Sequence, residues 1–229
     1  MANEPNPLLE GLPQMNSKGI REYANGMGIP NIPQVTQKGI SNAMYVPANG
    51  VGLAETLVLK KKVEQKKREI ASNIGMIVYG NGYKVSPVVA HELGHATIAN
   101  DPEYTYHRMN QKYVSSPLLS IGGAVLGTLA GGAIGGQLTN GSLPGIVGGA
   151  MLGDFLGLSA PRLVNEYEAS RRANEYLDAS KGNDHQDREK ERQVLKNAYK
   201  SYIYGAIAST AIAGGISAYV NYKPKASIF

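Results

Sequence analysis

The sequence predicts a mainly helical, membrane-associated protein with a short β-hairpin and a Gly-rich transmembrane helical hairpin. Three observations lead to this fold class. Residues His91 to His95 read H-E-x-x-H, a pattern that places both histidines on one face of a helix. Three later segments are almost free of charge and approach the roughly 20 residues needed to cross a bilayer. Small residues, mostly glycines, recur at every fourth position of these segments.

Composition limits what the chain can be. Its 229 residues suffice for one medium domain, or for a small domain with appendages. The absence of Cys excludes disulfides and thiolate metal sites, so any metal must be held by His, Asp or Glu. The net charge of +5 is modest and mixed with acids, which does not predict nucleic-acid binding but suits a chain near an anionic membrane surface.

Residues 1–52 are predicted to form an extended arm rich in Pro and Asn. Six prolines between Pro5 and Pro47 argue against long helices and central strands. The arm is expected to be either loosely ordered or draped over a partner. The start of the chain lacks a basic stretch followed by an apolar core, so no signal peptide is expected.

Residues 53–115 are predicted to hold a basic helix, a β-hairpin and the helix of the H-E-x-x-H motif. The helix from Leu53 to Ser72 carries two lysine-rich runs, which favour a solvated or membrane-facing basic face over a nucleic-acid patch. Gly75–Tyr79 and Tyr83–Val85 flank a Gly-Asn-Gly turn and are expected to pair as a hairpin. Ser86-Pro87 is a good helix start, and the helix is expected to end near Asn100.

Residues 116–160 are predicted to form the transmembrane hairpin, and residues 201–229 a third apolar helix and a tail. Pro117 to Leu138 and Ile203 to Val220 carry no charge, whereas Leu143 to Ala160 carries only Asp154. The four-residue rows are Gly123, Gly127, Gly131 and Gly135, then Gly145, Gly149, Gly153 and Gly157, then Gly205, Ser209, Ala213 and Ser217. Such rows allow close helix packing in membranes. In a soluble assembly, the alternative, each glycine would cost about 1 kcal/mol against Ala.

Residues 161–200 are predicted to be a polar helical stretch broken near Lys181–Asp184. His91 and His95 supply two neutral nitrogen ligands, and Glu92 a carboxylate base, which is the minimum for a zinc hydrolase. A third ligand is required. Asp101 follows His95 by six residues, but Ile98 stands where such sites use Gly. His107 and His185 have no spacing relation to the motif.

A second motif supplies the favoured third ligand. The words Asn165–Ser170 and Arg171–Ala173 resemble the E-x-x-A-[D/S] signature of gluzincin-type metallopeptidases, and the chain looks closest to the bacterial neutral zinc metallopeptidases with H-E-[VL]-G-H-A. It is more distantly similar to the HtpX and CAAX-prenyl-protease membrane peptidases. The resemblance covers roughly residues 75–178. It implies a zincin-like helical core, with His91, His95 and Glu166 as Zn²⁺ ligands and Glu92 as catalytic base.

The hairpin supports this assignment independently. Two spans return the chain to the side that it left, so the His helix and the Glu166 helix emerge at one membrane face. Glu168, two positions on, points elsewhere on its helix. Basic residues gather at that face, which predicts that it is cytoplasmic; they are Arg108, Lys112, Arg162, Arg171 and Arg172. A third span would send Lys223 and Lys225 to the far side, against the same tendency.

The expected function is a membrane-associated zinc endopeptidase acting on peptide or protein substrates. Tyr106, Tyr113, Arg171 and Arg172 are candidate oxyanion or substrate contacts. Two alternatives stay open: a structural, oligomeric membrane or virion component with a secondary or vestigial zinc site, and a cell-wall amide hydrolase using the same chemistry. The expected partners are a lipid membrane and further copies of the chain in a homo-oligomer or larger assembly, with no nucleic acid.

Overall fold

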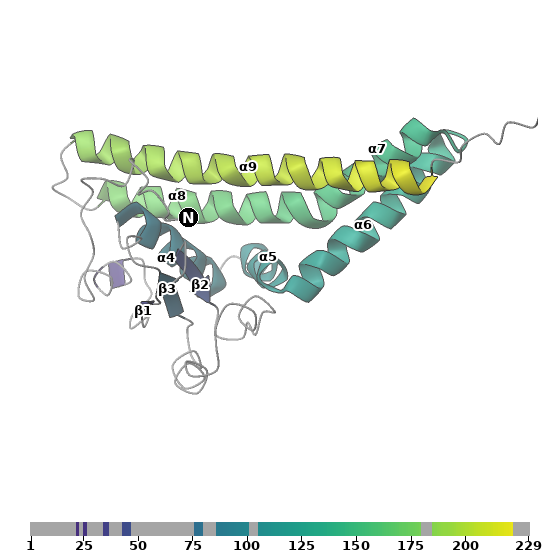
Figure 1. The fold of residues 1–229 in the computed structure, drawn as a ribbon. Coiled ribbons are helices and arrows are strands. Elements are labelled where there is room, and N and C mark those ends of the chain that lie inside the picture. Colours follow the sequence, from purple (N-terminus) through teal and green to yellow (C-terminus); the bar gives the residue numbers. More distant parts are fainter. Residues whose placement is uncertain are drawn as a thin grey trace, which may run out of the picture. The chain divides into compact units, whose positions relative to one another are not determined.

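The protein is mainly helical in its computed structural model (Figure 1), which describes residues 22, 25–26, 34–36, 43–46, 76–79, 86–100, 105–179 and 185–221. The chain divides into two compact units. Unit 1 holds residues 1–116 and 164–201, and unit 2 holds residues 117–163 and 202–229. The predicted basic helix at Leu53–Ser72 lies outside the described residues.

A three-stranded sheet belongs to unit 1. Its order is β1 (Gln34–Thr36), β3 (Met76–Tyr79) and β2 (Ala43–Val46). β1 pairs with β3 in parallel, with Val35 opposite Val78, and β2 pairs with β3 antiparallel, with Tyr45 opposite Ile77. The two edge strands therefore come from the Pro-rich arm.

The predicted hairpin needs correction. Both edges of β3 are taken by β1 and β2, rather than by the expected return strand at Tyr83–Val85, whose residues lie outside the described part. The Gly-Asn-Gly turn signal is local, whereas β3 pairs with segments that lie thirty or more residues away along the chain.

The helices of unit 1 carry its core. α4 (Ser86–Asn100) has the predicted bounds and contacts β2, β3 and α5 (Thr105–Ser115). Ala90 of α4 packs in one cluster with Ala173 and Leu177 of α8 (Ala160–Ala179) and Leu195 of α9 (His185–Asn221). The end of α8 and the start of α9 lie on either side of the predicted break at Lys181–Asp184.

Unit 2 contains a tight helical hairpin. α6 (Pro117–Leu138) is joined to α7 (Leu143–Asp154), which continues through a π-helical segment, η2 (Phe155–Ser159), into α8. At the tip, Asn140 and Gly141 adopt positive φ angles of 52° and 79°. Ser142 caps α7, since its hydroxyl accepts a hydrogen bond of 3.2 Å from the Gly145 N–H.

The two glycine rows of the hairpin contact each other directly. A Cβ atom at Gly131 would overlap the carbonyl oxygen of Gly149, and one at Gly135 would overlap that of Gly145. The same relation joins Gly127 to Gly153. Because only hydrogen stands on these Cα atoms, the two helix backbones approach each other more closely than any side chain would allow.

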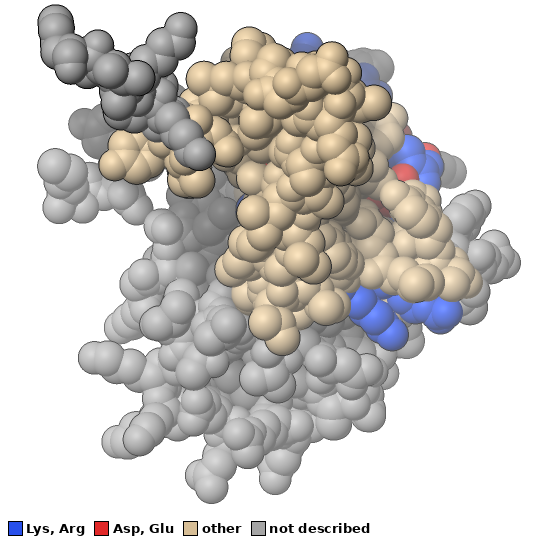
Figure 2. All heavy atoms as spheres, turned by 90° about the vertical axis from the view of Figure 1, so that its right-hand side faces the viewer, with Lys and Arg blue, Asp and Glu red and all other residues tan. Residues whose placement is uncertain are grey.

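Three helices of the described residues are long and apolar enough to cross a membrane: Pro117–Leu138, Leu143–Ala179 and Asp187–Asn221. Most of their apolar side chains are exposed, including Leu118, Leu138 and Tyr219. Figure 2 shows one face on which the described surface is almost wholly free of Lys, Arg, Asp and Glu, with charge only at its edge. These features suggest membrane association.

One carboxylate lies inside this apolar unit. Asp154 is buried at the end of α7, and its Oδ2 atom accepts hydrogen bonds from Ser209 Oγ at 3.1 Å and Thr210 Oγ1 at 3.4 Å. Both hydroxyls belong to α9. The contact between Gly214 and the Met151 side chain lies on the same side of α7 and α9. A polar cluster thus joins the third candidate span to the hairpin.

Candidate metal centre

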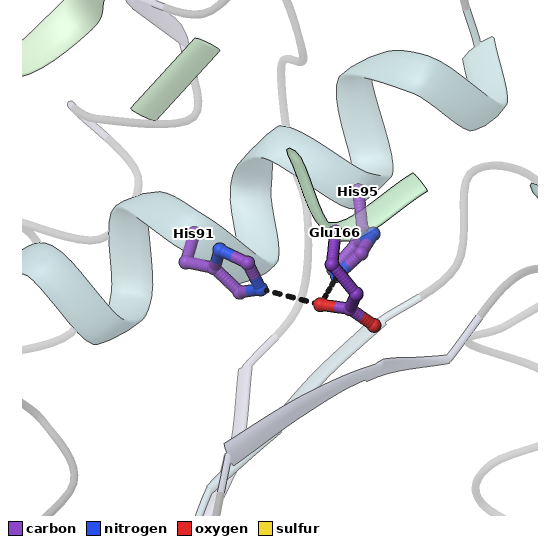
Figure 3. Close-up of side chains that lie close together, drawn as sticks. All are labelled: His91, His95 and Glu166. Atoms are coloured by element: carbon purple, nitrogen blue, oxygen red, sulfur yellow. Dashed lines mark hydrogen bonds and ion pairs between the residues drawn. The ribbon is translucent and has the colours of Figure 1, made fainter. Parts of the chain in front are cut away.

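Three side chains converge in unit 1. His91 and His95 project from successive turns of α4, and Glu166 reaches them from α8 (Figure 3). Glu166 Oε2 lies 3.1 Å from His91 Nε2 and 3.3 Å from His95 Nε2. All three residues are buried, and their donor atoms lie within 4.8 Å of one another.

The donor set fits zinc. Two imidazole nitrogens and one carboxylate oxygen form a ligand set found in catalytic zinc sites, where the fourth position stays open. With metal–ligand bonds of about 2.0–2.2 Å, tetrahedral donors lie about 3.4 Å apart. The two separations around Glu166 Oε2 are close to that value, and the separation between the two histidine nitrogens is no more than 4.8 Å, so the three donors surround a space in which an ion could bind.

The Nδ1 atoms of the two rings, which face away from Glu166, also have polar neighbours. His91 Nδ1 lies 3.1 Å from Ser170 Oγ. His95 Nδ1 lies 3.3 Å from Gln111 Oε1 and 3.2 Å from Asn165 Nδ2. These contacts orient the rings so that both Nε2 atoms face Glu166.

The two helices meet through a glycine. A Cβ at Gly94 would overlap the carbonyl oxygen of Ala169 and would lie 3.0 Å from its carbonyl carbon. Gly94 is thus the point of backbone contact between α4 and α8. This contact brings the imidazoles within reach of a side chain as short as that of Glu166.

The electrostatic state of the cluster is set by two opposing effects. Burial favours the neutral form of His95, but the adjacent Glu166 carboxylate outweighs it and raises the pKa of His95 above its usual 6.5. Smaller contributions in the same direction come from Glu92 and from the hydrogen bond to Gln111. Without a metal, the cationic form of the ring, which is protonated on both nitrogens, is therefore favoured.

The predicted catalytic base and the predicted arginines have distinct surroundings. Glu92 is buried on α4, next to His91 in the sequence. Arg171 Nη2 lies 2.6 Å and Arg172 Nε lies 3.0 Å from Glu168 Oε1, and Arg171 also pairs with Glu175. Glu168 therefore binds arginines, whereas its neighbour Glu166 faces the imidazoles.

The other candidates do not belong to this cluster or lie outside the described part of the chain. His107 stacks edge-on with Tyr106 on α5 at 5.4 Å between ring centroids, and Tyr113 is half-buried on the same helix. His185 begins α9, and Asp101 lies outside the described residues. Among the residues that the structure describes, the group that could hold a metal ion consists of His91, His95 and Glu166.

Sequence reasoning missed the contacts behind the rings. Ser170 follows Glu166 by four residues, one helical turn, so its place beside His91 was available from spacing. Asn165 precedes Glu166 and lay within the quoted motif, but its direction depends on the packing of α8. Gln111 comes from α5, between the two motifs, and no pattern in the sequence marks it.

The fold and the site define a mainly helical protein with a buried cluster of two histidines and one carboxylate that could hold a metal ion. A family model described as "putative neutral zinc metallopeptidase" matches residues 78–213. This match covers more than half of the chain, so the chain belongs to that family, which implies Zn²⁺ as the cofactor. No curated protein and no solved structure matches the chain.

Proposed function

We propose that this protein is a membrane-associated zinc metallopeptidase that hydrolyses peptide bonds with a metal-activated water. The observation that carries the proposal is the convergence of His91 Nε2, His95 Nε2 and Glu166 Oε2 in one buried cluster. Glu166 is the proposed third ligand, and Glu92 the proposed catalytic base.

The chemistry divides between the metal and the chain. When bound, zinc supplies a Lewis acid that acidifies water and polarises the scissile carbonyl. Glu92 accepts the proton of the attacking water and delivers it to the leaving amine. Tyr113, Arg171 and Arg172 are the proposed donors to the developing oxyanion or to the substrate. Arg171 and Arg172 would then need to keep donors free beyond their bonds to Glu168.

We further propose that α6, α7 and the C-terminal half of α9 span the membrane. Their length, their lack of charge and their exposed apolar side chains support this arrangement. The contacts of Ser209 and Thr210 with Asp154 support α9 as the third span, because they satisfy the one buried carboxylate of the unit. The basic residues near the catalytic helices support a cytoplasmic site.

The test combines metal content with peptide hydrolysis in the full-length, detergent-solubilised protein. Wild type is expected to bind one zinc per chain and to cleave members of a fluorogenic peptide library. Glu92→Gln is expected to keep the zinc but to lose about 10²–10⁴-fold in turnover, because only proton transfer is removed. His95→Ala is expected to lose the metal, whereas His107→Ala, outside the cluster, keeps it.

Two results would refute the proposal. Wild-type protein without stoichiometric zinc after metal reconstitution would exclude the site. Undiminished turnover in Glu92→Gln would exclude the mechanism. Hydrolysis of cell-wall amide substrates but not of peptides would move the same site to the amide-hydrolase class.

A further inference from the structure

Gln111 has a position that neither motif accounts for. It is buried on α5, and its Oε1 atom lies 3.3 Å from Nδ1 of His95. His95 presents its other nitrogen, Nε2, to Glu166. Gln111 thus lies on the opposite side of the imidazole from the proposed metal position.

Metal binding imposes one proton arrangement on His95. A neutral imidazole carries a single N–H, and a nitrogen that binds a metal must offer its lone pair. If Nε2 is the ligand atom, the proton must be on Nδ1, and Nδ1 then requires a hydrogen-bond acceptor. The carbonyl oxygen of the Gln111 amide is such an acceptor.

The orientation of the Gln111 amide is supported by its other end. Gln111 Nε2 donates to Ser115 Oγ at 3.4 Å, and the Ser115 hydroxyl donates in turn to the backbone oxygen of Gln111. Because that hydroxyl proton is already used, a flipped amide would place its oxygen against an oxygen with no proton to give. Ser115 therefore keeps Oε1 directed at His95.

Asn165 lies against the same nitrogen. Its Nδ2 atom lies 3.2 Å from His95 Nδ1, while its buried Oδ1 has no hydrogen-bond partner among the described residues. Exchanging the two amide atoms would give the oxygen a partner in an Nδ1–H but would leave the NH₂ group in the place without one. The argument for a proton on Nδ1 therefore rests on the Gln111 amide, whose orientation Ser115 fixes.

We infer that Gln111 is a positioning residue that fixes the Nδ1–H tautomer of His95 and so keeps Nε2 available for zinc. The inference rests on the proposed zinc site, and it adds α5 to the elements that build it. Removing the acceptor would let the ring shift to the Nε2–H tautomer, which donates to Glu166 and blocks the ligand atom. Outer contacts of this kind typically change metal affinity about 10–100-fold.

The experiment compares Gln111→Leu, which removes the acceptor at similar size, with Gln111→Glu, which keeps it. Zinc affinity is measured by chelator competition, and the tautomers of the four histidines by ¹⁵N NMR of the metal-free protein, well above the pKa of His95. Gln111→Leu is expected to bind zinc about 10–100-fold more weakly and to show the Nε2–H form. Gln111→Glu is expected to retain the Nδ1–H form and near wild-type affinity.

Gln193→Leu is the matched control, because Gln193 bonds to Asn197 on α9 by a similar amide contact one turn away. It is expected to change neither readout. Wild-type affinity and an unchanged His95 tautomer in Gln111→Leu would overturn the inference. If that variant does not fold, an Nε2–H tautomer in wild type or in Gln111→Glu would overturn it equally. Loss of zinc binding by wild type itself would instead refute the proposed function, while the tautomer of the metal-free protein would still test Gln111.

Discussion

Gly94 lies directly against the backbone of Ala169, closer than any side chain would permit. The glycine stands between Glu92 and His95 in the motif, and Ala169 stands between Glu166 and Ser170 on the facing helix. This backbone contact between α4 and α8 therefore lies among the residues of the candidate metal site. The width of the site is set by a backbone contact, which is stiffer than one made by side chains.

Replacing Gly94 by Ala is expected to weaken both the fold and the site. The added methyl group must push α8 away, and overpacking of this kind costs about 1–3 kcal/mol. The free energy of unfolding in denaturant should fall by that amount, and zinc affinity should fall with it. Gly122→Ala is the control, since a Cβ there meets nothing within 4 Å. Equal behaviour of the two variants would contradict the role of Gly94.

Glu166 and Glu168 provide a matched pair on one helix. Glu166→Ala is expected to abolish stoichiometric zinc binding, because it removes the proposed third ligand. Glu168→Ala should keep the zinc but lower the free energy of unfolding by about 1–3 kcal/mol, since largely buried Arg172 loses its acceptor. Metal analysis and denaturant unfolding separate the two effects. Zinc loss in Glu168→Ala with retention in Glu166→Ala would reverse the assignment.

The stabilisation by zinc is expected to increase with pH. Burial lowers the pKa of His95, but the effect of Glu166, which raises it, is the larger of the two. The pKa in the folded state therefore lies above the value of 6.5 in the unfolded state. The protonated ring thus stabilises the metal-free protein fully at pH values below the unfolded-state pKa. This contribution to stability is lost as pH rises through the raised pKa of the folded state. Zinc needs the neutral ring, so its binding strengthens over the same interval.

The measurement is the difference in Tm between zinc-loaded and chelator-treated protein across a pH series. The difference should widen from mildly acidic to mildly alkaline pH. In Glu166→Gln, the Tm of the metal-free protein should no longer fall as pH rises through this interval, because the negative charge that favours the protonated His95 ring is gone. A difference in Tm that stays constant with pH would contradict the coupling.

Asp154 is expected to hold α9 against the hairpin. Ser209 and Thr210 donate to the same oxygen, so Ser209→Ala and Thr210→Ala should each cost about 0.6 kcal/mol, the average for such bonds in membranes, and their effects should not add. Asp154→Asn retains an acceptor and should behave almost as wild type, whereas Asp154→Leu should not.

A cross-link can report this contact, because the chain has no Cys of its own. A Cβ at Gly214 would lie 2.7 Å from the Met151 side chain, so the Met151→Cys, Gly214→Cys pair should oxidise readily to a disulfide. Adding Asp154→Leu should slow this cross-linking, and adding Asp154→Asn should not. Equal rates of disulfide formation with Asp154, Asp154→Leu and Asp154→Asn would contradict the role of Asp154 in holding α9 against the hairpin.

The metal cluster was the most predictable part of the protein. Four-residue spacing placed His91 and His95 on one helix face, and an apolar hairpin between the motifs implied that Glu166 would return to them. The first inference follows from helical periodicity and the second from the even number of helices in the hairpin, and both can be read directly from the sequence. The contacts of Gln111 and Asn165 depend instead on how α5 and α8 rotate about their axes, which no spacing rule fixes.

The sheet was the least predictable part. β3 was expected from its apolar run, but its partners, β1 and β2, have only three and four residues and lie among prolines and glycines. Strands this short show no alternation from which a pairing could be inferred. Their pairing with β3 depends on tertiary contacts, including that between α4 and β2.

The spacing of the ligands also orders events in time. Glu166 lies 75 residues after His91, and the segment between them includes α5 and the glycine-lined hairpin. On the proposed ligand assignment, the motif helix is synthesised with two of the three zinc ligands, and the third, Glu166, follows only after the hairpin has been made. The zinc site of the nascent chain would therefore stay incomplete, and unable to activate water, until the hairpin has been synthesised.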